Sequence, residues 1–236
     1  MSLLAEIAKT KAKRSTQRQL YLSMLAGISI SIGCIGLAFV RSDSPLSWSV
    51  SGILSGFVFS FGLFTIFALG LELFTGNCIF LSAYMSDDIS LLDLVEVLVY
   101  TLLGNIAGCI FIWGIFSLCQ LSYADVLRAT ANAKVDLPLI QLFFRGVMCN
   151  IVISFASLMS FKGECLVTKF FAALLPVIIF VACGFEHSIA DAFILLFSSL
   201  NIFKVITCFV TVLLGNIVGG AIIAAFHYLI NSPYSR

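Results

Sequence analysis

Long apolar segments follow one another along almost the whole chain, separated by short polar stretches. They fall at residues 20–40, 50–84, 91–119, 137–160, 166–200 and 203–230. Each contains at least the ~20 residues that a helix needs to cross the hydrocarbon core of a bilayer. The pattern therefore predicts an all-α membrane protein with six transmembrane helices.

The second and fifth segments are too long for one straight helix across the bilayer. At 1.5 Å per residue, segment 50–84 would extend about 50 Å, whereas the hydrocarbon core is ~30 Å thick. Each carries a polar interruption, Gly-Leu-Glu at 70–72 and Cys-Gly-Phe-Glu-His at 183–187. A break at membrane depth is tolerated only where it is buried in protein or lines a wet cavity. Both segments are therefore predicted to be broken helices that mark a transport site.

The two halves of the chain show the same order of motifs. Gly-Leu-Glu at 70–72 is followed by Gly-Asn at 104–105, and Gly-Phe-Glu at 184–186 is followed by Gly-Asn at 215–216. The interval from glutamate to Gly-Asn is nearly equal in the two copies, which indicates an internal repeat. Each copy holds three spans, an odd number, so the second copy must be inverted in the membrane. Inverted repeats of broken helices place a binding site near the bilayer midplane.

Four polar residues are candidates for supporting the breaks. Asn105 and Asn216 each follow a glycine, and small residues let helices approach closely, so a role in helix packing and a role in the pore both stay open. We expect Glu72 and Glu186 to satisfy backbone groups at the ends of the broken helices rather than to bind substrate.

The chain divides into three parts on this interpretation. A basic segment, 1–19, is expected to form an amphipathic helix on the membrane surface. It precedes a channel domain, 20–230, with repeats at 20–119 and 137–230, and a short tail, 231–236. Five cations lie in the first part: Lys9, Lys11, Lys13, Arg14 and Arg18. The protein is expected in the plasma or inner membrane of the cell. Because cytoplasmic segments of membrane proteins carry an excess of Lys and Arg, both termini are expected in the cytoplasm.

Composition supports a membrane protein and narrows the chemistry. Hydrophobic residues make up 61% of the 236 positions and charged residues 11%, against roughly 45–50% and about 25% in soluble domains. The eight cysteines are scattered singly, without a CxxC pair, and are expected to be small buried residues. The sequence therefore predicts no metal site, no cofactor and no nucleic-acid partner.

Four segments resemble the formate/nitrite transporter family, and the likeness covers nearly the whole chain. Phe-Val-Ala-Cys-Gly-Phe-Glu-His-Ser-Ile-Ala at 180–190 is similar to that family's fifth-helix signature. Glu-Leu-Phe-Thr-Gly-Asn at 72–77 is similar to its break in the second helix. Arg-Gly-Val-Met-Cys-Asn at 145–150 and Gly-Asn-Ile-Val-Gly-Gly at 215–220 complete the set. The resemblance implies a homopentamer of aquaporin-like protomers, each with its own pore through the bilayer.

The resemblance also implies roles for individual residues. His187 would be a buried histidine at the middle of the pore, with Thr75 and Asn150 as its polar partners, and Lys134 would be the family's vestibule lysine. Two apolar constrictions would flank the histidine. The cytoplasmic one would consist of Phe59, Leu63 and either Phe74 or Leu73, and the outer one of Leu73, Ile153 and Phe180. One departure stands out, because Asp191 occupies a position where many members have asparagine.

The cost of moving an ion through such constrictions favours a weak acid as substrate. Transfer of a bare carboxylate into a medium of low dielectric constant costs on the order of 20 kcal/mol. Protonating a carboxylate of pKa near 3.9 at pH 7 costs only about 4 kcal/mol. We therefore expect the anion to be attracted into the vestibule by Lys134 and to pass as the neutral acid. The predicted function is a channel or transporter for formate, nitrite, hydrosulfide or short monocarboxylates, together with a proton.

Two alternatives remain at this stage. An aquaporin-like channel for small neutral solutes fits the implied fold, but the paired Asn-Pro-Ala signature of that group is absent. An intramembrane enzyme that uses His187 and Glu186 would need a paired nucleophile, a metal-ligand cluster or a phosphate-binding loop, and the sequence offers none of these. Whether His187 itself donates a proton also stays open.

Overall fold

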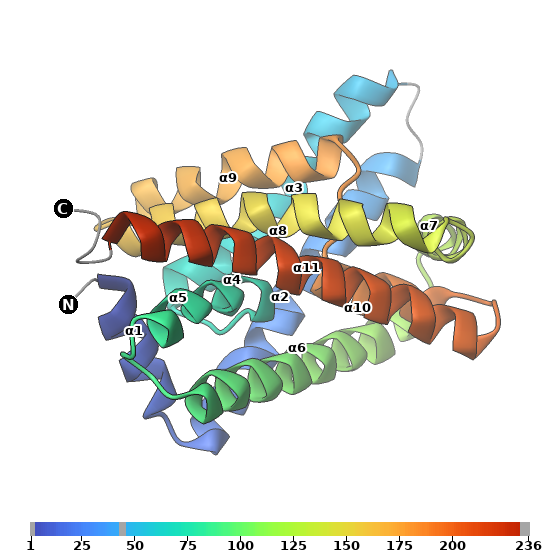
Figure 1. Ribbon diagram of the computed structural model, residues 1–236. Coiled ribbons are helices and arrows are strands. Elements are labelled where there is room, and N and C mark those ends of the chain that lie inside the picture. The colour runs from blue at the N-terminus through green and yellow to red at the C-terminus, as the bar shows by residue number, and fades with distance from the viewer. Residues whose placement is uncertain (1–2, 43–45, 232–236) are drawn as a thin grey trace.

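Helices make up most of the chain in the computed structural model, which describes residues 3–42 and 46–231 (Figure 1). In chain order the elements are α1 (Leu3–Ala12), α2 (Thr16–Ser42), α3 (Trp48–Leu69), α4 (Phe74–Asn77), η1 (Cys78–Phe80), α5 (Leu81–Met85), α6 (Leu91–Cys119), α7 (Ala124–Val135), α8 (Leu139–Lys162), α9 (Leu166–Ala182), α10 (Ser188–Ile194), η2 (Leu195–Phe197) and α11 (Ile202–Asn231). Within these two ranges there is no β-strand, so the predicted all-α class is confirmed.

The predicted membrane spans correspond to these helices. Five of the described helices, α2, α3, α6, α8 and α11, are long and apolar enough to cross a bilayer. The second predicted span consists of α3 followed by the short elements α4, η1 and α5. The fifth consists of α9 followed by α10 and η2. Both long segments are thus broken helices, as their length and polar interruptions predicted.

Two features at the ends of the spans differ from the hydropathy pattern. The basic N-terminal helix, α1, ends at Ala12, and α2 already begins at Thr16. Helix α7 was not predicted, because it is short and mixed in polarity and buries only Leu127 and Ala131. Residues 232–236, most of the expected tail, lie outside the described residues.

A glycine in the left-handed conformation ends the first half of each broken helix. Gly70 has φ 64° and Gly184 has φ 71°, values that glycine adopts without the strain of a Cβ atom. The next residue then donates its backbone N–H five residues back, from Leu71 to Ile66 at 2.9 Å and from Phe185 to Phe180 at 3.0 Å. This is the bond of a Schellman motif, which terminates a helix and satisfies its last carbonyl groups. The two breaks therefore share one local mechanism.

The helix pairings repeat between the two halves. Helix α2 packs against α3 and α6 in the first repeat, and α8 packs against α9 and α11 in the second. Helices α3 and α9 join the repeats to each other. Both ends of the described chain, α1 and the end of α11, lie at one end of the bundle, and α7 lies at the other (Figure 1). The arrangement agrees with two inverted three-helix repeats.

The glycines of the Gly-Asn pairs lie at close helix crossings. A Cβ atom at Gly104 would lie 2.4 Å from Cβ of Ser23, and one at Gly215 would lie 2.3 Å from the backbone oxygen of Phe143. These separations are shorter than any van der Waals contact, so only glycine lets α6 meet α2, and α11 meet α8, at this distance. The packing role of these glycines is therefore established.

We expect Gly108→Ala to destabilise the protein, because its Cβ atom would lie 2.2 Å from the backbone oxygen of Met24 on α2. Overpacking of this kind costs about 1–3 kcal/mol. Gly114→Ala is the matched control on the same helix, since nothing lies within 4 Å of the added atom. Thermal unfolding of the purified variants in detergent measures the difference. Equal midpoints for the two variants would contradict the close crossing of α2 and α6.

Candidate functional site

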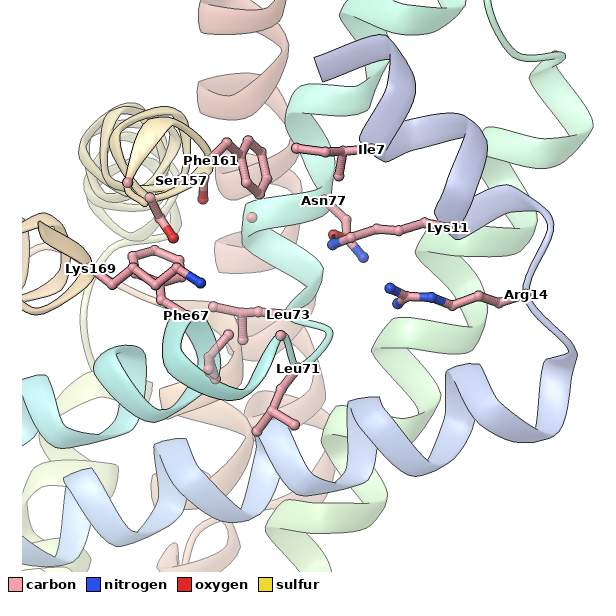
Figure 2. Close-up of a pocket in the computed structure, with 15 residues that line it drawn as sticks. Ile7, Lys11, Arg14, Phe67, Leu71, Leu73, Asn77, Ser157, Phe161 and Lys169 are labelled. Atoms are coloured by element: carbon pink, nitrogen blue, oxygen red, sulfur yellow. Dashed lines mark hydrogen bonds between the residues drawn. The ribbon is translucent and has the colours of Figure 1, made fainter. Parts of the chain in front are cut away.

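Two cavities approach the broken helices from opposite ends of the bundle. The α1 cavity, about 280 Å³ in volume, lies under α1 and is lined by Lys11, Arg14, Phe67, Leu73, Ser157 and Lys169 among others. The α7 cavity, about 370 Å³, is lined by Arg41, Phe59, Lys134, Arg145, Phe180 and His187 among others. Figure 2 shows the α1 cavity, with Lys11 and Arg14 on one side and Lys169 on the other.

His187 lies at the start of the second half of the broken fifth span, where it caps α10. Its Nδ1 atom accepts a hydrogen bond from the backbone N–H of Ala190 at 3.2 Å. Its Nε2 atom lies 2.9 Å from the hydroxyl oxygen of Thr75. The ring is stacked on that of Phe180, with centroids 5.9 Å apart, and only 2% of the residue is exposed.

These two contacts fix the protonation of the ring. Because Nδ1 accepts a bond, it carries a lone pair, and the neutral imidazole must hold its proton on Nε2. Nε2–H then donates to Thr75. A second proton on Nδ1 would remove the cap of α10. The arrangement therefore favours a neutral His187 that presents one N–H donor at the end of the α7 cavity.

Buried apolar side chains separate the two cavities. All six residues expected in the constrictions belong to one hydrophobic cluster and are at most 4% exposed: Phe59, Leu63, Leu73, Phe74, Ile153 and Phe180. Leu73 lines the α1 cavity, and Phe180 lines the α7 cavity. Leu63, Phe74 and Ile153 belong to the same buried cluster and are not among the described residues that line either cavity.

The position of Phe59 differs from the expectation. It lines the α7 cavity, opposite to the side inferred from the resemblance, and its ring meets that of Phe180 edge to face at 5.6 Å. Phe59 precedes the break at Gly70 by three helical turns, or about 16 Å, so it lies closer to the α7 end of α3. Phe67, two turns further along α3, lines the α1 cavity instead.

Side chains of Asn105 and Asn216 hold the two breaks through equivalent hydrogen bonds. Asn105 Oδ1 accepts from the backbone N–H of Phe74 at 2.9 Å, and its Nδ2 donates to the carbonyl groups of Ser23 and Glu72 at 2.8 Å. Asn216 does the same in the second repeat. Its Oδ1 accepts from the N–H of Ser188 at 2.8 Å, and its Nδ2 donates to the carbonyl groups of Gly146 and Glu186 at 2.8 and 2.9 Å.

The asparagines thus satisfy the backbone groups that the glutamates were expected to satisfy. Each uses all three of its side-chain bonds on main-chain atoms of the break and of the neighbouring helix. Asn150 adds a tie in the second repeat, where its Nδ2 donates to the carbonyl group of Asn216 at 2.6 Å. Within the described chain no hydrogen bond joins Asn150 to His187, so the structure brings Thr75 to the histidine but not Asn150.

The carboxylate of Glu72 lies in a cluster of cations under α1. Glu72 is 0% exposed and forms ion pairs with Lys11, at 2.8 Å, and with Arg14. It also accepts a hydrogen bond from the side chain of Asn77 at 2.9 Å. Burial lowers the pKa of Lys11 from its ordinary value, and the nearby Glu72 only partly opposes this shift. The cluster fastens α1 over the first break.

Glu186 occupies the equivalent position at the other end. The ammonium group of Lys134, on α7, pairs with Glu186 and with Asp191, the latter at 2.9 Å. Burial opposes the charge of Lys134, but Asp191 and Glu186 outweigh it and raise the pKa of the lysine above its ordinary value. Arg145 lies at 3.9 Å from Glu186. Lys134 therefore lines the α7 cavity as expected, although two carboxylates share its charge.

Sequence reasoning missed most of these charged partners. Lys11 and Arg14 were seen only as members of a basic segment, and Asp191 only as a departure from the family pattern. One signal was present, since Asn77 follows Glu72 by five residues, as Asp191 follows Glu186. The equal spacing in the two repeats could have indicated that each glutamate has a polar companion one helical turn into the next helix.

Comparisons with known proteins find relatives of this chain over most of its length. A family model described as "Formate/nitrite transporter" matches residues 1–230. The chain is 28% identical to the formate channel FocA of Haemophilus influenzae over 92% of this chain and 89% of the relative. It is 33% identical to the nitrite transporter NirC of Escherichia coli over 72% of this chain and 64% of the relative. Twenty-seven per cent identity and a TM-score of 0.80 relate it to a solved structure titled "Pentameric formate channel with formate bound", over 91% of this chain and 96% of that one.

Substitution of His187 separates its capping role from its role as a donor. We expect His187→Ala to lower the free energy of unfolding by about 1–3 kcal/mol, because Ala190 N–H and Thr75 lose a buried partner. His187→Asn keeps a side-chain oxygen that can cap α10 and should recover most of this loss. Chemical or thermal unfolding of the purified variants measures the effect. If both substitutions cost the same, His187 does not cap α10.

Proposed function

The chain belongs to the formate/nitrite transporter family, and from that premise we propose that it passes small monovalent weak-acid anions across the membrane as the neutral acid. Members of this family are channels and transporters rather than enzymes. The proposed substrates are formate, nitrite, hydrosulfide and short monocarboxylates. Relatives named as a formate channel and as a nitrite transporter support the first two.

One observation carries the proposal. Two cavities with cationic walls approach from opposite ends, buried apolar side chains lie between them, and one buried polar pair, His187 and Thr75, lies where the α7 cavity meets this apolar layer. The cations raise the local concentration of an anion. The apolar layer then rejects the bare ion, because its transfer costs on the order of 20 kcal/mol by the idealised Born estimate. Protonation, at about 4 kcal/mol for a carboxylate at pH 7, is the cheaper route.

The residues of the site take the following roles in this proposal. Lys134 keeps a positive charge in the α7 cavity at physiological pH. Phe59 and Phe180 form the apolar wall on that side, and Leu73 forms it on the other. His187 stays neutral, and its Nε2–H can turn from Thr75 to an oxygen of the passing acid. Asn150 supports the break through Asn216 and does not act as a partner of the histidine.

We propose the remaining features from the family and from the distribution of charge. The solved relative is titled as pentameric, which supports a homopentamer in the lipid bilayer for this chain. The basic segment 1–19 and the tail 231–236 would lie in the cytoplasm, with the channel domain, 20–230, in the membrane. On this orientation the α1 cavity opens to the cytoplasm and the α7 cavity opens outward.

Uptake of formate into proteoliposomes tests the proposal. At a fixed total concentration of formate, the initial rate should rise toward about tenfold per pH unit between pH 7 and pH 5, because the protonated fraction of an acid of pKa near 3.9 rises by that factor. A pH-sensitive dye in the lumen should report one proton for each formate. Protein-free liposomes give the background rate to be subtracted.

The same assay on His187→Asn asks which group titrates. We expect a lower rate but an unchanged dependence on pH, since the substrate and not the neutral imidazole takes up the proton. Loss of the pH dependence in this variant would show that His187 itself titrates. If proteoliposomes with the wild-type protein take up glycerol, measured by their swelling, as fast as they take up formate, the result would instead support a channel for neutral solutes.

A further inference from the structure

The charged residues of the α7 cavity divide into two groups. Five line it: Arg41, Lys134, Arg145, Glu186 and Asp191. Lys134 pairs with both carboxylates, and Arg145 lies 3.9 Å from one of them. Four of the five charges therefore belong to a single cluster at the second break. The fifth, Arg41, stands apart from it.

Arg41 has no carboxylate partner in the described part of the chain. No Asp or Glu oxygen of a described residue lies within 4.0 Å of its guanidinium group. Its Nε–H donates to the hydroxyl group of Ser55 at 3.2 Å. Among the described residues, the two terminal NH2 groups of Arg41 have no hydrogen-bond acceptor. Ser55 holds the base of the fork, and no described residue accepts a hydrogen bond from its end.

The position of Arg41 is at a junction between two spaces. Besides the α7 cavity, it lines an adjoining cavity of about 330 Å³, together with Trp48, Ser51 and Gly52 at the start of α3. Arg41 therefore lies at a boundary that the two cavities share. Phe59 and His187, which line the α7 cavity with it, lie on the way to the apolar layer.

A simpler role for Arg41 is to stabilise the end of α2, where it lies in the last turn. A cation at that place interacts favourably with the helix dipole. That role requires only a positive charge, and lysine would serve it equally. Binding of a planar anion instead requires the fork of arginine, which donates two parallel hydrogen bonds to two oxygens. The two roles therefore predict different effects of Arg41→Lys.

We propose that Arg41 forms an anion-binding subsite at the mouth of the α7 cavity, selective for planar anions with two oxygens. This inference rests on the proposed function and adds a residue and a preference to it. Carboxylates and nitrite match the fork, whereas hydrosulfide has a single acceptor atom and cannot receive two parallel hydrogen bonds on two separate atoms. The subsite holds the anion outside the apolar layer, before Lys134 and His187.

Uptake kinetics in membrane vesicles of known orientation test the subsite. The variants are Arg41→Gln and Arg41→Lys. The control is Arg128→Gln, which removes one positive charge from α7, where Arg128 pairs with the exposed Asp125 and does not line the cavity. Right-side-out and inverted vesicles present the two ends of the pathway separately, and formate and hydrosulfide are compared at low ionic strength. Thermal unfolding of each purified variant confirms that it is folded.

For formate supplied on the α7 side, we expect Arg41→Gln to raise KM about tenfold, with a smaller change in maximal rate. Arg41→Lys should raise KM for formate severalfold and leave KM for hydrosulfide near the wild-type value. Arg128→Gln should change neither. Three results would each overturn the subsite. They are an unchanged KM for formate in Arg41→Gln, the same KM for formate in Arg41→Lys as in the wild type, and an increase in KM for formate in Arg128→Gln as large as that in Arg41→Gln. No uptake by the wild type above vesicles without the protein would overturn the proposed function, and the subsite with it.

Discussion

Backbone polar groups in a bilayer core have no water to bond, and the centre of this molecule is arranged around that constraint. Each broken helix is held by one asparagine, Asn105 or Asn216, whose side chain makes three hydrogen bonds to the main chain. Once the breaks are fixed, α10 begins in the interior of the protein, and His187 caps it. The polar pair at the end of the α7 cavity therefore depends on how the backbone is satisfied at the break.

The two repeats share this frame and differ in the charges around it. Glu72 meets Lys11, Arg14 and Asn77 in the first repeat, whereas Glu186 meets Lys134 and a second carboxylate, that of Asp191, in the second. The cations that line the α1 cavity include Lys169 as well, so both cavities have positive side chains for attracting an anion. The two repeats thus have equivalent backbone breaks but different charged side chains at the two ends of the pathway.

The parts of the structure that depend on local chemistry could be predicted from the sequence. Comparison of segment length with bilayer thickness predicted the spans, and a glycine two residues before a glutamate predicted the breaks at Gly70 and Gly184. Partners set by tertiary docking could not be predicted in this way. Glu72 meets its cations only because α1 folds back over the break. Phe59 lies on the α7 side, and not on the expected side, because its depth in the membrane depends on where α3 starts. Asn150 has a partner on α11 that no spacing along α8 reveals.

The central claim is that the substrate crosses the apolar layer without net charge. The most direct test is the electrical response of proteoliposomes to a formate gradient, with valinomycin and potassium used to set the membrane potential. The account predicts that formate uptake carries no current and that its rate does not change with the potential. A formate-dependent current, or a rate that follows the potential, would show that the anion itself crosses and would contradict the account.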